Sequence, residues 1–118
     1  MGIKVRKERM TNVTGNEPKE IMPDEVKRSI EQGEQVHIID VREPEEWTAG
    51  HIPGAKLIPL GFIPFRYTEL DPDKEYVIVC RSGHRSGLAC EQLQALGYKA
   101  VNMAGGMLEW DGEVSYED

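Results

Sequence analysis

The sequence predicts an α/β fold, a small parallel β-sheet with helices on both of its faces. Its 118 residues are close to the commonest length of a single domain. From residue 19 onward, short apolar segments alternate with segments of helical character, and this alternation is typical of parallel sheets. In such sheets, functional loops lie at the carboxyl ends of the strands, where a strand turns into a helix.

The first elements follow from proline, glycine and the apolar spacing. A short extended segment covers 20–22. Pro23 suits the first position of a helix, and the two acidic residues after it suit the positive helix end. Val26 and Ile30 lie four residues apart and share one face, and Gly33 ends the helix.

The middle of the chain predicts two strands and two short helices. Segment 36–41 has the composition of a strand that is buried on both sides. Residues 44–47 form one helical turn, which Gly50 ends. A further strand covers 55–58, and a short helix covers 62–67.

The most apolar strand is 76–79, and it leads directly into the loop 80–86. The helix that follows presents one apolar face and ends at Gly97; that face consists of Ala89, Leu93 and Leu96. The last strand is 99–102, followed by two glycines and a short helix that extends through Trp110.

Residues 1–18 have no periodic apolar face and are rich in turn-forming residues. We therefore expect a mobile tail over 1–18 and a single domain over 19–118.

Charge and composition exclude several classes of protein. The chain has 14 basic and 21 acidic residues, a net charge of −7 and a pI near 5.0, so it lacks the basic surface of a general nucleic-acid or membrane binder. No apolar run is long enough to span a bilayer, and the basic start has no secretory pattern. Two cysteines and three scattered histidines match no metal-site spacing, so we expect no metal site. The composition favours a soluble cytoplasmic protein.

Cys80 is the best candidate for a nucleophile. It ends the most apolar strand and begins a loop of small and cationic residues, Cys80-Arg-Ser-Gly-His-Arg-Ser86. Backbone N–H groups of a loop that Gly83 allows to curl, the positive end of the next helix, and the guanidinium groups of Arg81 and Arg85 would all lower the pKa of the thiol. A lowered pKa increases the fraction of reactive thiolate.

Four motifs in order resemble the rhodanese family of sulfurtransferases, and the resemblance extends over about residues 20–111. They are Ile39-Asp-Val-Arg42 with the following Glu-Pro-Glu-Glu-Trp47, Gly50-His-Ile-Pro-Gly-Ala55, Val79-Cys-Arg-Ser-Gly-His-Arg-Ser86, and Gly105-Gly-Met-Leu-Glu-Trp110. Each motif alone is a weak signal, but four at the family's spacing are a strong one.

The resemblance implies that the Cys80 thiolate attacks the outer sulfur of thiosulfate or a similar donor, releases sulfite and becomes a persulfide. A thiophilic acceptor such as cyanide, glutathione or a protein thiol then takes that sulfur. The resemblance therefore implies no metal or organic cofactor, because sulfur itself does the covalent work. Substrate-binding residues would be Arg81, Ser82, Gly83, His84 and Arg85, with Asp40 and Arg42 in support.

Three other functions stay open at this point. The protein could be a persulfide carrier that turns over free thiosulfate poorly, or a non-catalytic binding domain of the same fold. A cysteine phosphatase or arsenate reductase is disfavoured, because the family comparison gives phosphatases five residues between cysteine and arginine and this loop has four. The intact Cys80 and both loop arginines argue against the binding domain.

The supporting residues have simpler interpretations. We expect Asp40 and Arg42 to form a structural ion pair, with substrate contact as the second possibility. His51 is expected to pack within its loop, and Cys90 to be buried and inert rather than a resolving thiol. His84 either tunes the loop or points to solvent.

Trp47 and Trp110 are interpreted as packing residues. The apolar connection 57–65 is predicted to form a wall beside the site or a contact surface for an acceptor protein. We expect a monomer or a weak homodimer.

Overall fold

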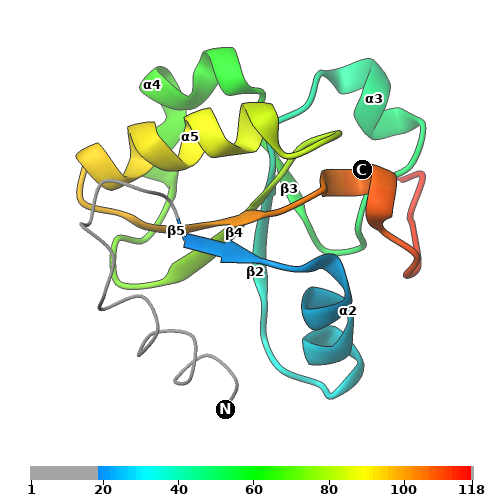
Figure 1. Ribbon diagram of the computed structural model, residues 1–118. Helices are drawn as coiled ribbons and strands as arrows, with labels where there is room; N and C mark the ends of the chain where they lie inside the picture. Colours follow the sequence, from blue (N-terminus) through cyan, green and yellow to red (C-terminus); the bar gives the residue numbers. More distant parts are fainter. Residues whose placement is uncertain (1–18, 118) are drawn as a thin grey trace.

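The computed structural model describes residues 19–117, and the predicted tail over 1–18 lies outside the described residues. Its centre is a five-stranded sheet in the order β1-β5-β4-β2-β3, in which every neighbouring pair is parallel (Figure 1). The strands are β1 (Lys19–Ile21), β2 (His37–Asp40), β3 (Lys56–Leu57), β4 (Glu75–Val79) and β5 (Lys99–Met103). The predicted parallel sheet is confirmed.

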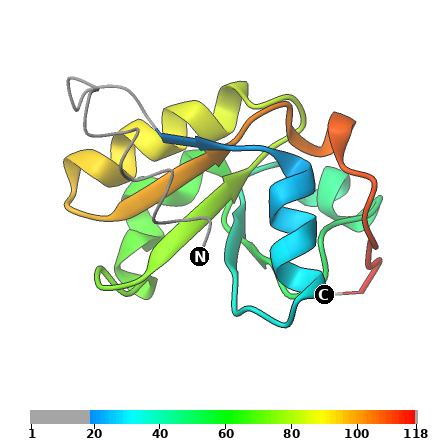
Figure 2. The same ribbon diagram turned by 60° about the horizontal axis from the view of Figure 1, so that its bottom comes forward.

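Helices cover both faces of this sheet, as predicted. The α-helices are α2 (Pro23–Glu31), α3 (Pro44–Thr48), α4 (Ile63–Arg66) and α5 (His84–Ala95). Three 3-10 helices complete the fold: η1 (Leu60–Phe62), η2 (Tyr67–Glu69) and η3 (Gly106–Glu109). Helices α4 and α5 lie on one face of the sheet, and α2 lies on the other (Figures 1 and 2). No helix in the described residues is long and apolar enough to cross a membrane.

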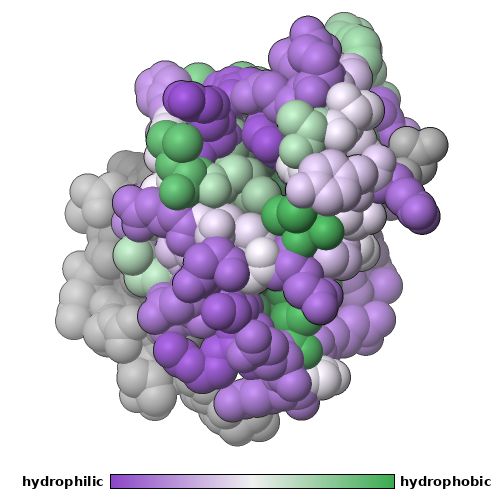
Figure 3. All heavy atoms as spheres, turned by 90° about the vertical axis from the view of Figure 1, so that its right-hand side faces the viewer, coloured by the Kyte–Doolittle hydropathy of each residue, from purple (hydrophilic) through white to green (hydrophobic). Residues whose placement is uncertain are grey.

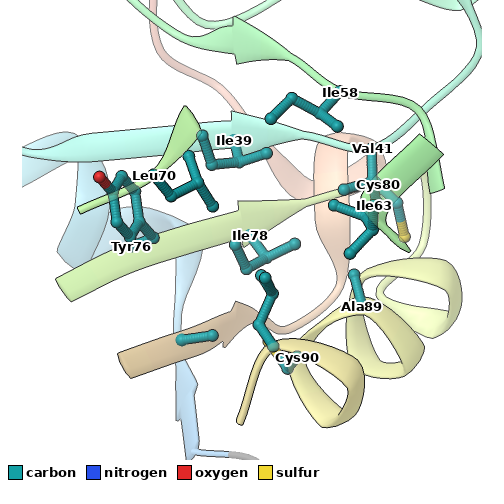
Figure 4. Packing of buried hydrophobic residues seen from close by; sticks show 12 residues of the cluster. Ile39, Val41, Ile58, Ile63, Leu70, Tyr76, Ile78, Cys80, Ala89 and Cys90 are labelled. Carbon is teal, nitrogen blue, oxygen red and sulfur yellow. The ribbon is translucent and has the colours of Figure 1, made fainter. Parts of the chain in front are cut away.

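Two apolar clusters fill the spaces between the layers. Successive residues of a strand point to opposite faces, so Ile38 belongs to the cluster under α2 and Ile39 to the cluster under α5. In β4, Val77 and Val79 belong to the cluster under α2, and Ile78 belongs to the cluster under α5. Figure 4 shows the cluster under α5 from close by. The central strands are therefore buried on both sides, as their composition predicted.

Two residues that were expected on buried helix faces are exposed. Val26 is fully buried on α2, but Ile30, one turn later, is 38 % exposed and borders a hollow shared with Pro53 and Trp110. Leu96 is 45 % exposed because α5 ends at the preceding residue and the chain turns away at Gly97, where φ is 92°.

Candidate active site

Cys80 stands at the carboxyl end of β4, a central strand of the sheet, in the position that the sequence predicted. Its side chain is 1 % exposed and belongs to the cluster under α5 (Figure 4). The next residues turn sharply, and Gly83 adopts φ 101° immediately before α5 begins at His84. This left-handed conformation suits glycine, because a β-carbon would make it strained.

The turn directs hydrogen-bond donors at the Cys80 sulfur. The N–H of Gly83 donates to Sγ across 3.0 Å, and the Ser86 hydroxyl lies 3.2 Å from it. Burial of Cys80 acts to raise the pKa of the thiol. The hydrogen bonds from the Ser86 hydroxyl and from the N–H groups of Ser86, Gly83 and Ser82 outweigh burial, so the pKa of Cys80 lies below its ordinary value.

Helix η3 holds the loop from the other side. The N–H of Met107 donates to the carbonyl of Cys80 at 2.9 Å, and that of Leu108 donates to the carbonyl of Arg81 at 3.0 Å. Gly106 makes this approach possible, because a β-carbon there would lie 2.5 Å from both carbonyl oxygens. Gly106 thus serves the loop, and both glycines of the last motif adopt the positive φ that the chain turn requires, 79° at Gly105 and 61° at Gly106.

Ser86 and Asn102 form a buried polar pair behind the sulfur, and both are missing from the predicted set of site residues. The Ser86 Oγ lies 2.5 Å from Asn102 Oδ1, and the amide nitrogen of Asn102 donates to the Gly83 carbonyl at 3.1 Å. Both residues are buried. A polar side chain within the otherwise apolar inner part of β5 was a signal that could have identified Asn102.

Arg85 forms a two-point ion pair with Glu46 of α3. Its two terminal nitrogens donate to the two carboxylate oxygens at 2.8 and 2.9 Å. These bonds hold the pKa of Glu46 down to about 2 and raise the pKa of Arg85, to which the charge of Cys80 also contributes. Arg85 therefore lies close enough to Cys80 for their charges to interact, but its guanidinium is already engaged by a carboxylate. Glu46 was not among the predicted site residues.

The remaining predicted loop residues differ in their orientation. The side chains of Arg81, Ser82 and His84 are exposed, so of the two alternatives for His84 the structure supports the solvent-facing one. Gly83 contributes its backbone to the sulfur. Nothing in the structure tests the binding of a donor by these residues, which stays a prediction.

Asp40 and Arg42 form the predicted ion pair. The guanidinium donates to both carboxylate oxygens, with distances of 2.8 to 3.1 Å, and also to the carbonyl of Gly50 at 2.9 Å. Both side chains are buried. The pair thus ties the end of β2 to the loop at Gly50 and has a structural role.

His51 and Cys90 also have the packing roles that were expected. The ring of His51 stacks on Trp47 with centroids 3.5 Å apart, and its Nδ1 lies 2.9 Å from the Trp47 carbonyl. Cys90 is fully buried, and burial raises the pKa of its thiol to about 12, so it is not poised to react. Among the described residues, no group of three metal-binding side chains lies together.

The connection from 57 to 65 exposes two aromatic side chains. Phe62 is 54 % exposed and Phe65 is 80 % exposed. On the face seen in Figure 3, by contrast, apolar residues form only small, separate patches among polar ones. The predicted role of 57–65 as a contact surface stays a prediction.

The chain is similar to known proteins over most of its length. The model of the rhodanese-like domain family matches residues 22–113. The protein named "Putative sulfurtransferase YtwF" of Bacillus subtilis is 50 % identical over 97 residues, which cover 82 % of this chain and 94 % of that protein. A second relative from the same organism, "Putative sulfur carrier protein YrkF", is 40 % identical over 95 residues. That match covers 80 % of this chain and 51 % of the relative, so the chain spans about half of that protein.

A solved structure shows the same fold. The rhodanese-like domain protein from Staphylococcus aureus superimposes with a TM-score of 0.80 at 40 % identity, covering 85 % of this chain and 99 % of that one. The names of the relatives associate such chains with sulfur transfer in general. The chain belongs to the rhodanese-like domain family.

Proposed function

We propose that this protein is a sulfurtransferase that moves a sulfane sulfur from thiosulfate or a similar donor to a thiophilic acceptor through a persulfide on Cys80. The observation that carries the proposal is the set of donors around Sγ, the Gly83 N–H at 3.0 Å and the Ser86 hydroxyl at 3.2 Å. Such donors stabilise a thiolate, which is the nucleophilic form of cysteine. The names of the relatives support the reaction class.

The first half of the reaction loads the cysteine. The Cys80 thiolate attacks the outer sulfur of thiosulfate, a new S–S bond forms, and the original S–S bond breaks. Sulfite leaves with the electron pair of the broken bond. The N–H groups of the loop are suited to stabilise negative charge that remains on the persulfide.

The second half unloads it. Cyanide, glutathione or a protein thiolate attacks the outer sulfur, and Cys80 leaves as a thiolate. The Gly83 N–H and the Ser86 hydroxyl then stabilise this leaving group in the same way as they stabilise the nucleophile of the first half. The sulfur atom carries all of the covalent chemistry, so the cycle needs no further redox partner.

Arg81 and Arg85 supply positive charge for the anionic end of the donor. Arg81 is exposed and free to contact it at the mouth of the loop. Arg85 contacts the donor by sharing its guanidinium between the donor and Glu46, since both terminal nitrogens bond to that carboxylate. The exposed Ser82 and His84 would border the bound donor.

We place this activity in a single domain over 19–118, acting as a monomer or weak homodimer in a reducing compartment such as the cytoplasm. A reducing compartment suits the proposal because its chemistry requires Cys80 as a free thiol, which is its state in this structure.

A persulfide carrier is the second candidate. The carrier name of one relative favours it, and so do the exposed side chains of Phe62 and Phe65, which offer an apolar contact to a partner protein. A carrier would load with sulfur as readily as an enzyme but would release it only to a protein.

Steady-state turnover tests the proposal and separates the two candidates. With thiosulfate and cyanide, the enzyme should form thiocyanate over many cycles, and Cys80→Ala should form none while keeping its circular dichroism spectrum. Turnover by Cys80→Ala would contradict the assignment. Loading without turnover until a protein acceptor is added would favour the carrier. Hydrolysis of an aryl phosphate in place of sulfur transfer would favour the phosphatase.

A further inference from the structure

The hydroxyl of Ser86 lies between two acceptors but has only one hydrogen to donate. Cys80 Sγ lies 3.2 Å from Ser86 Oγ on one side, and Asn102 Oδ1 lies 2.5 Å from it on the other. All three side chains are buried, with 5 % exposure or less, so solvent water is poorly placed to satisfy whichever acceptor the hydroxyl leaves.

The orientation of the Asn102 amide is fixed from outside this pair. Its nitrogen donates to the carbonyl of Gly83 at 3.1 Å, so its oxygen must face Ser86. Turning the amide over would place its oxygen against the Gly83 carbonyl oxygen, which has no hydrogen to offer. Asn102 is therefore an acceptor toward Ser86 in every charge state of the site.

The charge on Sγ decides where the Ser86 hydrogen goes. In the thiol form, Cys80 donates to Ser86 and Ser86 donates to Asn102, so every buried group has a partner. In the thiolate form, Ser86 turns to Sγ and leaves two acceptor oxygens facing each other 2.5 Å apart. Once Sγ is bonded to a second sulfur, its negative charge moves to the outer atom and the hydrogen can return to Asn102.

We propose that Asn102 is a positioning residue that draws the Ser86 hydrogen away from Sγ and so favours the thiol and the persulfide over the free thiolate. This inference rests on the proposed function. It gives the protein a means of holding a loaded sulfur, because the form of Cys80 that Asn102 disfavours is the leaving group of the unloading step.

Two substitutions and their combination test this proposal. Asn102→Ala removes the competing acceptor, so Ser86 can donate to the thiolate without leaving an unpaired oxygen. The pKa of Cys80 should fall, and the acid dissociation constant of its thiol should rise about three- to tenfold, the range set by one neutral hydrogen bond. Ser86→Ala removes the donor and should raise the pKa of Cys80. In the Ser86→Ala background, Asn102→Ala should lose its lowering effect.

The comparison in two backgrounds is needed because Asn102 also holds the Gly83 carbonyl. Loosening Gly83 would weaken its N–H bond to Sγ and raise the pKa of Cys80, and this effect is present with or without the Ser86 hydroxyl. The charged groups around the site also stay in place in both backgrounds. Their influence on the pKa of Cys80 therefore cancels when the effects of Asn102→Ala in the two backgrounds are compared. These groups are Arg81, His84, Arg85, Glu46, Asp40, Arg42 and Glu109, and the titratable Cys90 stays as well.

The measurement is the pH dependence of Cys80 alkylation by iodoacetamide, followed by peptide mass to separate it from Cys90. The proposal is supported if Asn102→Ala lowers the pKa of Cys80 more, or raises it less, with Ser86 present than in the Ser86→Ala background. An equal shift in both backgrounds, or a lower pKa only in the Ser86→Ala background, overturns it. Asn102→Leu has a similar volume and no polar atom, and it gives the same test if the alanine variant unfolds. No sulfur donor takes part, so a protein that titrates as expected but never loads sulfur would refute the proposed function and the role of Asn102 toward a persulfide, while the effect of Asn102 on the thiol would stand.

Discussion

The side chains of Arg85 and Glu46 meet in a two-point ion pair, with nitrogen–oxygen distances of 2.8 and 2.9 Å, although they lie 39 residues apart in the chain. The pair joins the start of α5, beside Cys80, to the short helix α3. In the proposed mechanism, the pair therefore determines how much of the positive charge of Arg85 reaches a donor at Cys80.

Glu46→Gln should increase the affinity for an anionic donor. Glutamine has the shape of glutamate but no charge, so the guanidinium of Arg85 loses its anionic partner and attracts thiosulfate more strongly. We expect the KM for thiosulfate to fall about two- to fivefold, the effect of a partly exposed charge pair, with a smaller change in kcat. Steady-state thiocyanate formation measures both constants. A higher KM would show instead that Glu46 holds Arg85 in the orientation that the donor needs.

The same ion pair should make stability depend on acid pH. The pKa of Glu46 falls from 4.5 to about 2 on folding, chiefly through its bond to Arg85. Its stabilisation is therefore complete above pH 4.5 and is lost as the pH falls through 2. Because the pair is partly exposed, we expect about 1 to 2 kcal/mol at pH 7. Urea unfolding of the wild type and Glu46→Gln should show a difference in free energy that shrinks between pH 5 and pH 2.5. A difference that is independent of pH would contradict this.

Gly106→Ala should disrupt the active-site loop. Its β-carbon would lie 2.5 Å from the carbonyl oxygens of Cys80 and Arg81, which are backbone atoms that cannot move aside without shifting the loop. Gly54→Ala is a matched control, because Gly54 also has a positive φ but has no atom near its β-carbon position. The control should lose about 1 kcal/mol of unfolding free energy from backbone strain alone. Gly106→Ala should lose at least about 2 kcal/mol more and most of its turnover. Equal effects in urea unfolding and in the turnover assay would refute this role of Gly106.

Cys90→Ala should keep full sulfur transfer. The Cys90 side chain is fully buried and the pKa of its thiol is raised to about 12, so it forms almost no thiolate at neutral pH. Removing a buried sulfur should cost about 1 kcal/mol of unfolding free energy. Turnover and urea unfolding, measured side by side, check the two expectations. Loss of turnover in a folded variant would mean that Cys90 takes part as a second thiol.

Local patterns in the sequence predicted much of the site. The apolar segment that ends at Val79, the loop that follows it and the left-handed Gly83 all depend on neighbours in the chain, and the structure confirms them. The ion pair of Asp40 and Arg42 spans only two residues and was also predicted correctly.

The contacts that sequence reasoning missed join distant segments. Arg85 was expected to face the donor, but it pairs with Glu46 of α3, and nothing in the sequence near either residue indicates this pairing. Asn102 reaches Ser86 because β5 lies beside β4, which is known only once the strand order is known.

Leu96 fits the apolar spacing of its helix and is exposed because the helix ends before it.

Intact-protein mass spectrometry after brief exposure to thiosulfate tests the central claim most directly. Persulfide formation on Cys80 adds one sulfur, about 32 Da, which should disappear on adding cyanide and should never appear in Cys80→Ala. The same gain in Cys90→Ala would confirm that the sulfur sits on Cys80. A protein that gains no sulfur from thiosulfate or from other sulfane donors, or one that gains it without Cys80, would contradict this account.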